Sequence, residues 1–318
     1  MTWVTWRQQR TEVLIAAGIL ALVAVVLLPT GIEMASAYHH DGLAACLGQT
    51  TSSSCDDAIH VFTGRFQSLG NLLAWFTLVP GLIGVVLAAP FVLELENGTH
   101  RLAWTQSITR RRWITSKLAL TVGGALLAAL VLTLLMTWWH TPLDRLNGRM
   151  DNSVYDTEGI VVFGYTLFAL GLAIAVGVVW RRTIPAVVIA FIGYFAARIT
   201  VDTWLRQRLV TPLTATWRGD FAPARLNHAW LISQQPSDKL GHPISLKIGR
   251  CAGAAAGHVK DVIVNGNCVV QNGDSYMHAV YQPASRFWLL QGIETSMFGG
   301  TALVLILFAA WWTHQRAA

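Results

Sequence analysis

The chain has 318 residues, of which 53% are hydrophobic and only 13% are charged, and its formal net charge is +6. This composition is too apolar for an ordinary soluble domain and predicts a polytopic membrane protein. In a soluble chain the positive charge would suggest a nucleic-acid or acidic partner. In a membrane protein the basic residues must first be assigned to one or the other side of the membrane, and we expect no nucleic-acid partner.

Six apolar runs are each long enough to cross a hydrocarbon core of about 30 Å. The first run lacks a small-residue cleavage pattern, so we expect a retained span rather than a signal peptide. The basic and aromatic segment 1–12 before it is either an interfacial helix or a plain anchor. The expected spans are 13–32, 71–92, 113–139, 159–180, 185–201 and 287–312.

Some residues within these runs carry local expectations. Pro80 and Pro90 should bend the second span, and Gly123–Gly124 should offer the third span a face for close helix contact. The fifth span is expected to continue as an amphipathic extension through Trp204 and Arg208. The predicted fold class is therefore all-α and polytopic, with six transmembrane helices and a small mixed external domain between the fifth and the sixth.

The distribution of basic residues predicts the orientation. Segments 1–12, 93–112, 181–182 and 313–318 hold nine basic residues near span ends, whereas the two short loops on the other side hold three. By the positive-inside rule both termini are cytoplasmic in a multi-pass protein of the cell membrane. The predicted organisation is a cytoplasmic segment 1–12, a membrane domain 13–201, an external domain 202–286, and a sixth span with its tail at 287–318.

All four cysteines fall on the side that the charge count makes external. We favour the disulfides Cys46–Cys55 and Cys251–Cys268 because each pair lies within one loop, with free thiols as the alternative. The spacing of neither pair is that of a zinc site, and we expect no metal. Within 202–286, Val262–Val264 and residues 268–270 should form a hairpin around an Asn-Gly turn.

The stretch 93–117 is the densest polar island between two apolar runs. Its acidic residues end the second span, and Asn97-Gly98 is a helix-stop pair. Thr99 can cap a short helix over 100–106, and Thr109 can cap the next span at the basic run Arg110–Arg112. The glutamates would pair with a partner's basic residues or cap helix ends. On spacing alone, the stretch is either a docking element or a loop whose charges fix topology.

Two sequence matches favour the docking interpretation. Glu94-Leu95-Glu96-Asn97-Gly98-Thr99, followed by Trp104-Thr105-Gln106-Ser107-Ile108-Thr109-Arg110, resembles the first cytoplasmic loop of ABC exporter permeases of the type-two family, most closely the actinobacterial branch. Residues 282–294 resemble the entry to the last span of that family. In that family the loop is a coupling helix that rests on a separate ATPase subunit.

The resemblance implies a permease subunit of an ATP-driven exporter whose cargo is unidentified, with a hydrophobic molecule as one candidate. No Walker A phosphate loop is present, so ATP and Mg²⁺ are expected in partner ATPase subunits, with no cofactor and no catalysis in this chain. A second permease subunit, identical or different, is expected beside it in the lipid. The implied ATPase-coupling residues are Glu94, Glu96, Gly98, Thr99, Arg101, Leu102, Thr105, Gln106 and Arg110.

Two ionisable residues near the outer helix ends, Arg198 and Glu294, are candidates for the translocation path. The alternative for Arg198 is an ion pair with Asp202 on the same helix face. A membrane enzyme acting on lipid or cell-wall material, with His140, His228 and Asp202 as site residues, is a less favoured function. A non-energised membrane sensor or immunity protein is another.

Overall fold

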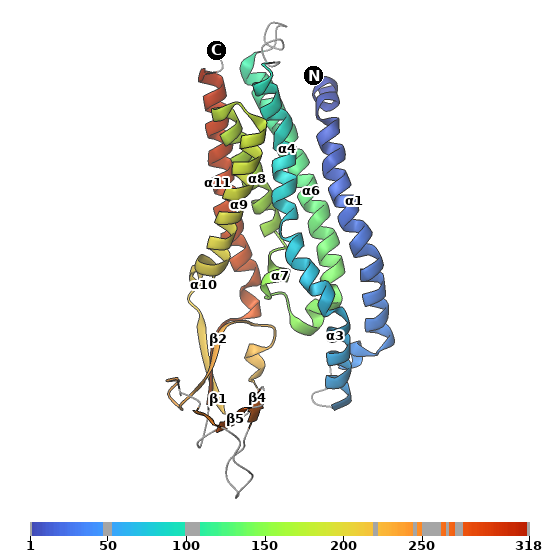
Figure 1. The fold of residues 1–318 in the computed structure, drawn as a ribbon, viewed down its shortest axis with the longest axis vertical. Helices are drawn as coiled ribbons and strands as arrows, with labels where there is room; N and C mark the ends of the chain where they lie inside the picture. The colour runs from blue at the N-terminus through green and yellow to red at the C-terminus, as the bar shows by residue number, and fades with distance from the viewer. Residues whose placement is uncertain are drawn as a thin grey trace, which may run out of the picture.

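The computed structural model describes residues 2–46, 53–98, 109–218, 222–243, 247–249, 262–264, 267–270 and 276–316. It shows an elongated bundle of long helices with the strands gathered at one end (Figure 1). Both chain termini lie at the opposite end, where α4 ends and α6 begins. We call these ends the sheet end and the termini end.

The helices vary from single turns to rods long enough to cross a membrane. In chain order they are α1 (Thr2–His40), α2 (Leu43–Cys46), α3 (Ser53–Phe76), α4 (Val79–Glu96), α6 (Arg110–Asn147), α7 (Asn152–Tyr155), α8 (Val161–Trp180), α9 (Thr183–Thr200), α10 (Arg206–Leu209) and α11 (Phe287–Arg316). A π-helical turn, Val201–Leu205, joins α9 to α10.

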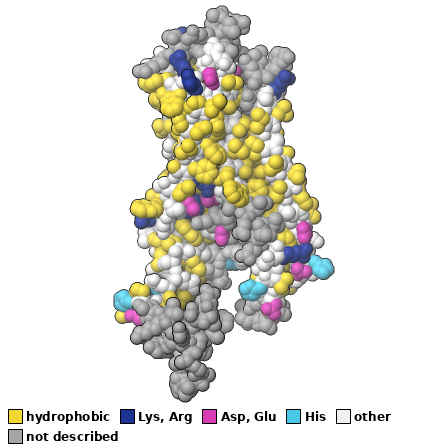
Figure 2. Space-filling view, in the orientation of Figure 1, with side chains coloured by type: hydrophobic (Ala, Val, Ile, Leu, Met, Phe, Trp, Pro, Cys, Tyr) yellow, Lys and Arg dark blue, Asp and Glu magenta, His cyan; other side chains and the backbone are white. Residues whose placement is uncertain are grey.

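Six helical segments of the described chain are long and apolar enough to span a membrane, as predicted. They are Val13–His40, Val79–Glu96, Arg110–Asn147, Val161–Trp180, Thr183–Leu209 and Ala284–Gln315. Figure 2 shows apolar side chains covering the visible face of the bundle between its two ends. The all-α polytopic fold with a small sheet region between the fifth and sixth spans is confirmed.

The second span begins later than expected. Helix α3 occupies much of the region predicted as an external loop, and α4 starts only at Val79 after a turn at Thr77–Leu78. Pro80 therefore lies in the first turn of α4, where its missing N–H costs nothing, and the expectation that it bends the span is wrong. Pro90 does lie inside α4.

Helix α8 forms the centre of the bundle and packs against α4, α6, α9 and α11. It is apolar on all sides, which is typical of a helix surrounded by other helices. Close approach depends on small residues: a Cβ at Gly171 would lie 3.0 Å from the Ala302 carbonyl oxygen of α11. At Gly84 of α4, an added Cβ would meet the Thr166 carbonyl of α8.

Gly123 and Gly124 do not make the close helix contact that the sequence led us to expect. Within the described residues, nothing lies within 4 Å of a Cβ built at either position. Both glycines instead line an apolar groove of about 430 Å³ that α6 forms with α1 and α4. The small side chains here leave space between helices rather than closing it.

The strands form two three-stranded antiparallel sheets with the orders β1-β6-β2 and β3-β5-β4. The first sheet is tied to the bundle because Gln282 donates to the Val210 carbonyl and Arg286 to the Thr211 carbonyl. The predicted hairpin is confirmed in β4 and β5, where Val264 pairs with Asn267. The strands are β1 (Leu213–Arg218), β2 (Trp230–Ser237), β3 (Lys247–Gly249), β4 (Val262–Val264), β5 (Asn267–Val270) and β6 (Tyr276–Gln282).

Candidate functional site

At the termini end, the last turn of α4 is bound to α6 by an ion pair. The Lys117 ammonium of α6 donates to Glu94 Oε1, and the Lys117 side chain is only 2% exposed. The same ammonium lies 5.6 Å from the centre of the Trp113 ring. A buried lysine needs such a partner because an unpaired charge there would be costly. Glu94 therefore has a partner within its own chain.

Glu96 is the last residue of α4, two positions after Glu94, and it binds the start of α9. Its Oε2 accepts hydrogen bonds from the Thr183 backbone N–H at 2.8 Å and from Thr183 Oγ1 at 2.6 Å. A carboxylate at a helix N-terminus satisfies a free backbone donor and complements the helix dipole. The predicted role of an acidic residue as a helix cap is thus confirmed for Glu96, across two helices rather than within one.

The turn that follows α4 agrees with the predicted helix stop. Gly98 has a φ of +69°, the left-handed conformation that glycine adopts without strain. On the far side, the Thr109 hydroxyl accepts from the Arg112 N–H and caps α6, and Arg110 is the first residue of that helix. The predicted coupling helix, with Thr99, Arg101, Leu102, Thr105 and Gln106, lies outside the described residues.

Near the sheet end, Arg206 is surrounded by three carboxylates. It lies 2.5 Å from Asp156 Oδ1, 2.7 Å from Asp202 Oδ1 and 3.0 Å from Glu294 Oε2. The Arg206 side chain is 2% exposed. We call Asp156, Arg198, Asp202, Arg206 and Glu294 the arginine network.

Arg198 belongs to the same network through a different partner from the one expected. Its guanidinium lies 2.5 Å from Asp156 Oδ2 and donates to the Thr77 carbonyl at 2.9 Å. Asp202 pairs with Arg206 instead, so the predicted ion pair between Arg198 and Asp202 is wrong. The physical reason is competition: Asp156 and the Thr77 carbonyl take the Arg198 guanidinium, while Asp202 pairs with Arg206, which is also four residues away.

Three members of the site were not predicted: Arg206, Asp156 and Tyr165. Asp156 lies in the linker between α7 and α8, and the Tyr165 hydroxyl of α8 lies 3.0 Å from Asp156 Oδ1 and 2.5 Å from Glu294 Oε1. Gln291 of α11 holds the linker by donating to the Tyr155 and Glu158 carbonyls. From the sequence, the only signal was an acid-rich loop next to a span.

The three residues proposed as an enzyme site, His140, His228 and Asp202, each contact different neighbours. Asp202 pairs with Arg206, and His228 packs against Gly148. His140 is fully buried beside Asp144 and Glu158. These three residues therefore do not form a nucleophile–base pair.

The cysteine predictions have different outcomes. Cys46 and Cys55 form a disulfide with a Cα–Cα distance of 5.5 Å, as predicted. For the second pair, Cys251 lies outside the described residues, while Cys268 is in β5. Cys55 belongs to α3, which lies toward the sheet end of the molecule (Figure 1).

The chain was compared with known protein families, curated proteins and solved structures. The model of a family described as ABC-2 membrane transporter related matches residues 17–206, which is more than half of the chain. The matched region begins in α1 and ends at Arg206 in α10. No curated protein and no solved structure matches the chain.

Proposed function

Since this chain belongs to the ABC-2 membrane transporter related family, we propose that it is the permease subunit of an ATP-driven exporter. In this proposal, cytosolic ATPase subunits bind at the termini end and supply ATP and Mg²⁺. The termini end then faces the cytoplasm, and the sheet end and the Cys46–Cys55 disulfide face outward. Export as the direction follows from the resemblance of residues 94–110 and 282–294 to exporter permeases.

The observation that carries this proposal is the way the ends of three spans are joined around the predicted coupling segment. The Glu94–Lys117 pair joins α4 to α6, and the Glu96–Thr183 hydrogen bonds join α4 to α9. A displacement of the chain between α4 and α6 would therefore act on three spans together. Those charged and polar contacts are what a coupling element needs if closure of an ATPase pair is to move the bundle.

Arg198 and Glu294 keep their proposed place on the translocation path. In the conformation described, Glu294 is buried, the Arg198 side chain is 10% exposed, and both are paired within the arginine network. A path past them therefore requires α9 to move away from α8 and α11, which breaks these pairs.

As cargo we propose a hydrophobic molecule, because the groove between α1, α4 and α6 is lined almost entirely by apolar side chains. A second permease subunit, identical or different, completes the proposed transporter.

The proposal is tested by ATP turnover of the partner ATPase, reconstituted in lipid with this protein. Glu96 is unsuitable for mutation because it also caps α9, so we choose Arg101→Glu within the predicted coupling helix. Stimulation of turnover by the permease should fall at least tenfold, because the substitution reverses a charge at the proposed contact.

The matched control is Arg225→Glu, which makes the same change at an exposed position in the sheet region. It should leave turnover unchanged, and both variants should unfold at the wild-type temperature. Equal stimulation by wild type and Arg101→Glu would contradict the proposed coupling site and leave the segment as a topology anchor.

A further inference from the structure

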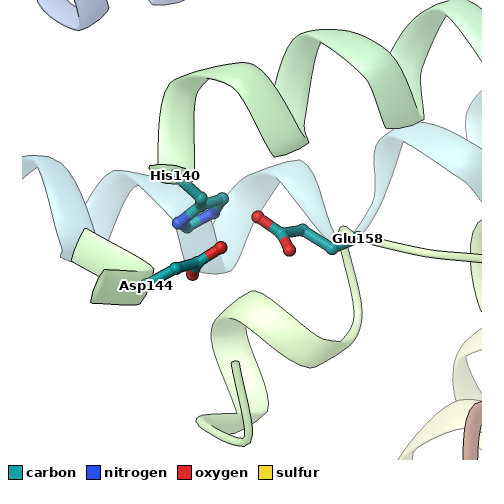
Figure 3. Close-up of side chains that lie close together, drawn as sticks. All are labelled: His140, Asp144 and Glu158. Carbon is teal, nitrogen blue, oxygen red and sulfur yellow. The ribbon is translucent and has the colours of Figure 1, made fainter. Parts of the chain in front are cut away.

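Three ionisable side chains meet near the sheet end, outside the arginine network. His140 and Asp144 are four residues apart on α6 and so share one helix face, while Glu158 comes from the linker between α7 and α8. One ligand atom from each residue lies within 4.8 Å of the other two. Figure 3 shows both carboxylates near the imidazole ring. We call these three residues the histidine cluster.

The cluster is buried without enough partners. His140 is 0% exposed, and among the described residues neither of its ring nitrogens has a hydrogen-bond partner. Asp144 Oδ1 and Glu158 Oε1 are also buried and have no donor in the part of the chain that the structure describes, except that the two carboxyls can share a proton with each other. Buried polar atoms are nearly always satisfied, because one that is left alone keeps the full cost of its removal from water. A proton shared by the two carboxyls satisfies only part of this group and leaves both imidazole nitrogens short of partners, so the cluster offers one nitrogen and two oxygen ligands to a cation.

One cation is already present, but at the edge of the cluster. Arg149 Nε lies 3.2 Å from Asp144 Oδ2 and 3.9 Å from Glu158 Oε2. It thus faces the second oxygen of each carboxylate and does not neutralise Asp144 Oδ1 or Glu158 Oε1. Its side chain is 45% exposed, so the cluster borders solvent on this side.

We propose that His140, Asp144 and Glu158 bind a divalent transition-metal ion, of which Zn²⁺ is the best fit. An imidazole nitrogen with two carboxylate oxygens suits Zn²⁺ or Mn²⁺ better than Mg²⁺ or Ca²⁺, which prefer oxygen ligands alone. Zn²⁺ with ligands at 2.0–2.1 Å holds neighbouring ligand atoms about 3.4 Å apart. Small side-chain rotations would bring the three ligands to that spacing.

The proposed ion has a structural consequence. It joins α6 to the linker before α8, and Gln291 of α11 already holds the Glu158 carbonyl at 3.1 Å. Arg149 supports the site by orienting the outer oxygens of the carboxylates, as groups next to metal ligands commonly do. With three protein ligands, one position stays available for water. The site does not depend on the proposed transport function.

The test uses the full-length protein in lipid nanodiscs, purified without a histidine tag and stripped with a chelator. After dialysis against Zn²⁺, elemental analysis should find one tightly bound Zn²⁺ per chain. Saturating Zn²⁺ should raise Tm by about 5 °C, because an ion that binds only the folded state stabilises it. Ca²⁺ should give no such rise, and an equal rise with Ca²⁺ would overturn the metal class.

Variants at the cluster decide whether the ion binds there. Asp144→Asn and Glu158→Gln keep the side-chain shape and should each weaken Zn²⁺ binding at least tenfold and remove the rise in Tm. The control His242→Leu removes a histidine from the exposed His242–Asp238 pair and should keep both properties. Absence of tight Zn²⁺ in the wild type, or full binding in both cluster variants, would overturn the proposal.

Discussion

Asp156 and Glu158 are two residues apart in the linker between α7 and α8, yet their carboxylates have opposite surroundings. Asp156 lies 2.5 Å from each of two arginines, Arg198 and Arg206. Glu158 has one half-exposed arginine at 3.9 Å and a second carboxylate, Asp144, beside it in the histidine cluster. In the first group the opposite charges largely compensate one another, whereas in the second the acids exceed the available partners.

The two groups show that the burial of a charged side chain and its pairing with an opposite charge are separate contributions to stability. Both groups are removed from water, and removing a charge from water is costly in either place. Only the arginine network recovers that cost through close contacts of opposite charge. The same kind of substitution, replacing one charged side chain by a neutral one, should therefore have opposite effects in the two groups.

The largest effect is expected for Arg206→Met. The substitution leaves Asp156, Asp202 and Glu294 without their shared cation, and breaking a buried ion pair in this way costs about 3–5 kcal/mol. Unfolding of the protein in detergent, followed by circular dichroism, measures the change in the free energy of unfolding. The matched control is Arg208→Met, which makes the same change at an exposed residue two positions away. Equal losses in both variants would show that the network does not stabilise the bundle.

Glu158→Gln should have the opposite sign in chelator-treated protein. Burial and the neighbouring Asp144 carboxylate raise the pKa of Glu158 above its ordinary value of 4.5. The folded state therefore holds the proton more tightly than the unfolded state, and the wild type loses stability as pH rises from 4.5 to the raised pKa. The glutamine variant avoids this loss and should be more stable by on the order of 1 kcal/mol at neutral pH.

The measurement is the free energy of unfolding against pH, with Asp156→Asn as the comparison in the other group. The advantage of Glu158→Gln should vanish at acidic pH, where the wild-type carboxyl is protonated in both states. Asp156→Asn should destabilise instead, because it leaves two arginines short of a partner. A loss of stability in metal-free Glu158→Gln would contradict the description of the histidine cluster as short of partners.

Local features of the fold were predictable from the sequence. The six apolar runs, the Asn-Gly hairpin, the Cys46–Cys55 disulfide and the turn at Gly98 each depend on residues close together in the chain. The start of the second span was misplaced because α3 continues the helix through a polar region before the turn at Thr77–Leu78. Hydropathy alone does not separate two helices that meet at such a turn.

The candidate site was predictable only in part. Arg198 and Glu294 were identified as unusual charges, but their partners come from the α7–α8 linker and from beyond a π-helical turn. Asp202 has an arginine four residues away on either side, and only the position of Asp156, which takes Arg198, decides that Asp202 pairs with Arg206. His140 and Asp144 stand at a spacing that places them on one face, yet nothing in the sequence brings Glu158 to them.

The smallest effect is expected for Glu33→Gln, which tests whether burial is what makes the arginine network strong. Arg65 Nη2 lies 2.7 Å from Glu33 Oε1, the same distance as between Arg206 and Asp202, but the side chains are 57% and 59% exposed. Exposed pairs contribute little, because water screens the charges and two long side chains lose freedom, so the loss should be at most about 0.5 kcal/mol. In 1 M salt it should disappear, because the screening length falls to about 3 Å. A loss comparable to that of Arg206→Met would mean that distance between charges, rather than their removal from water, determines the stability of both pairs.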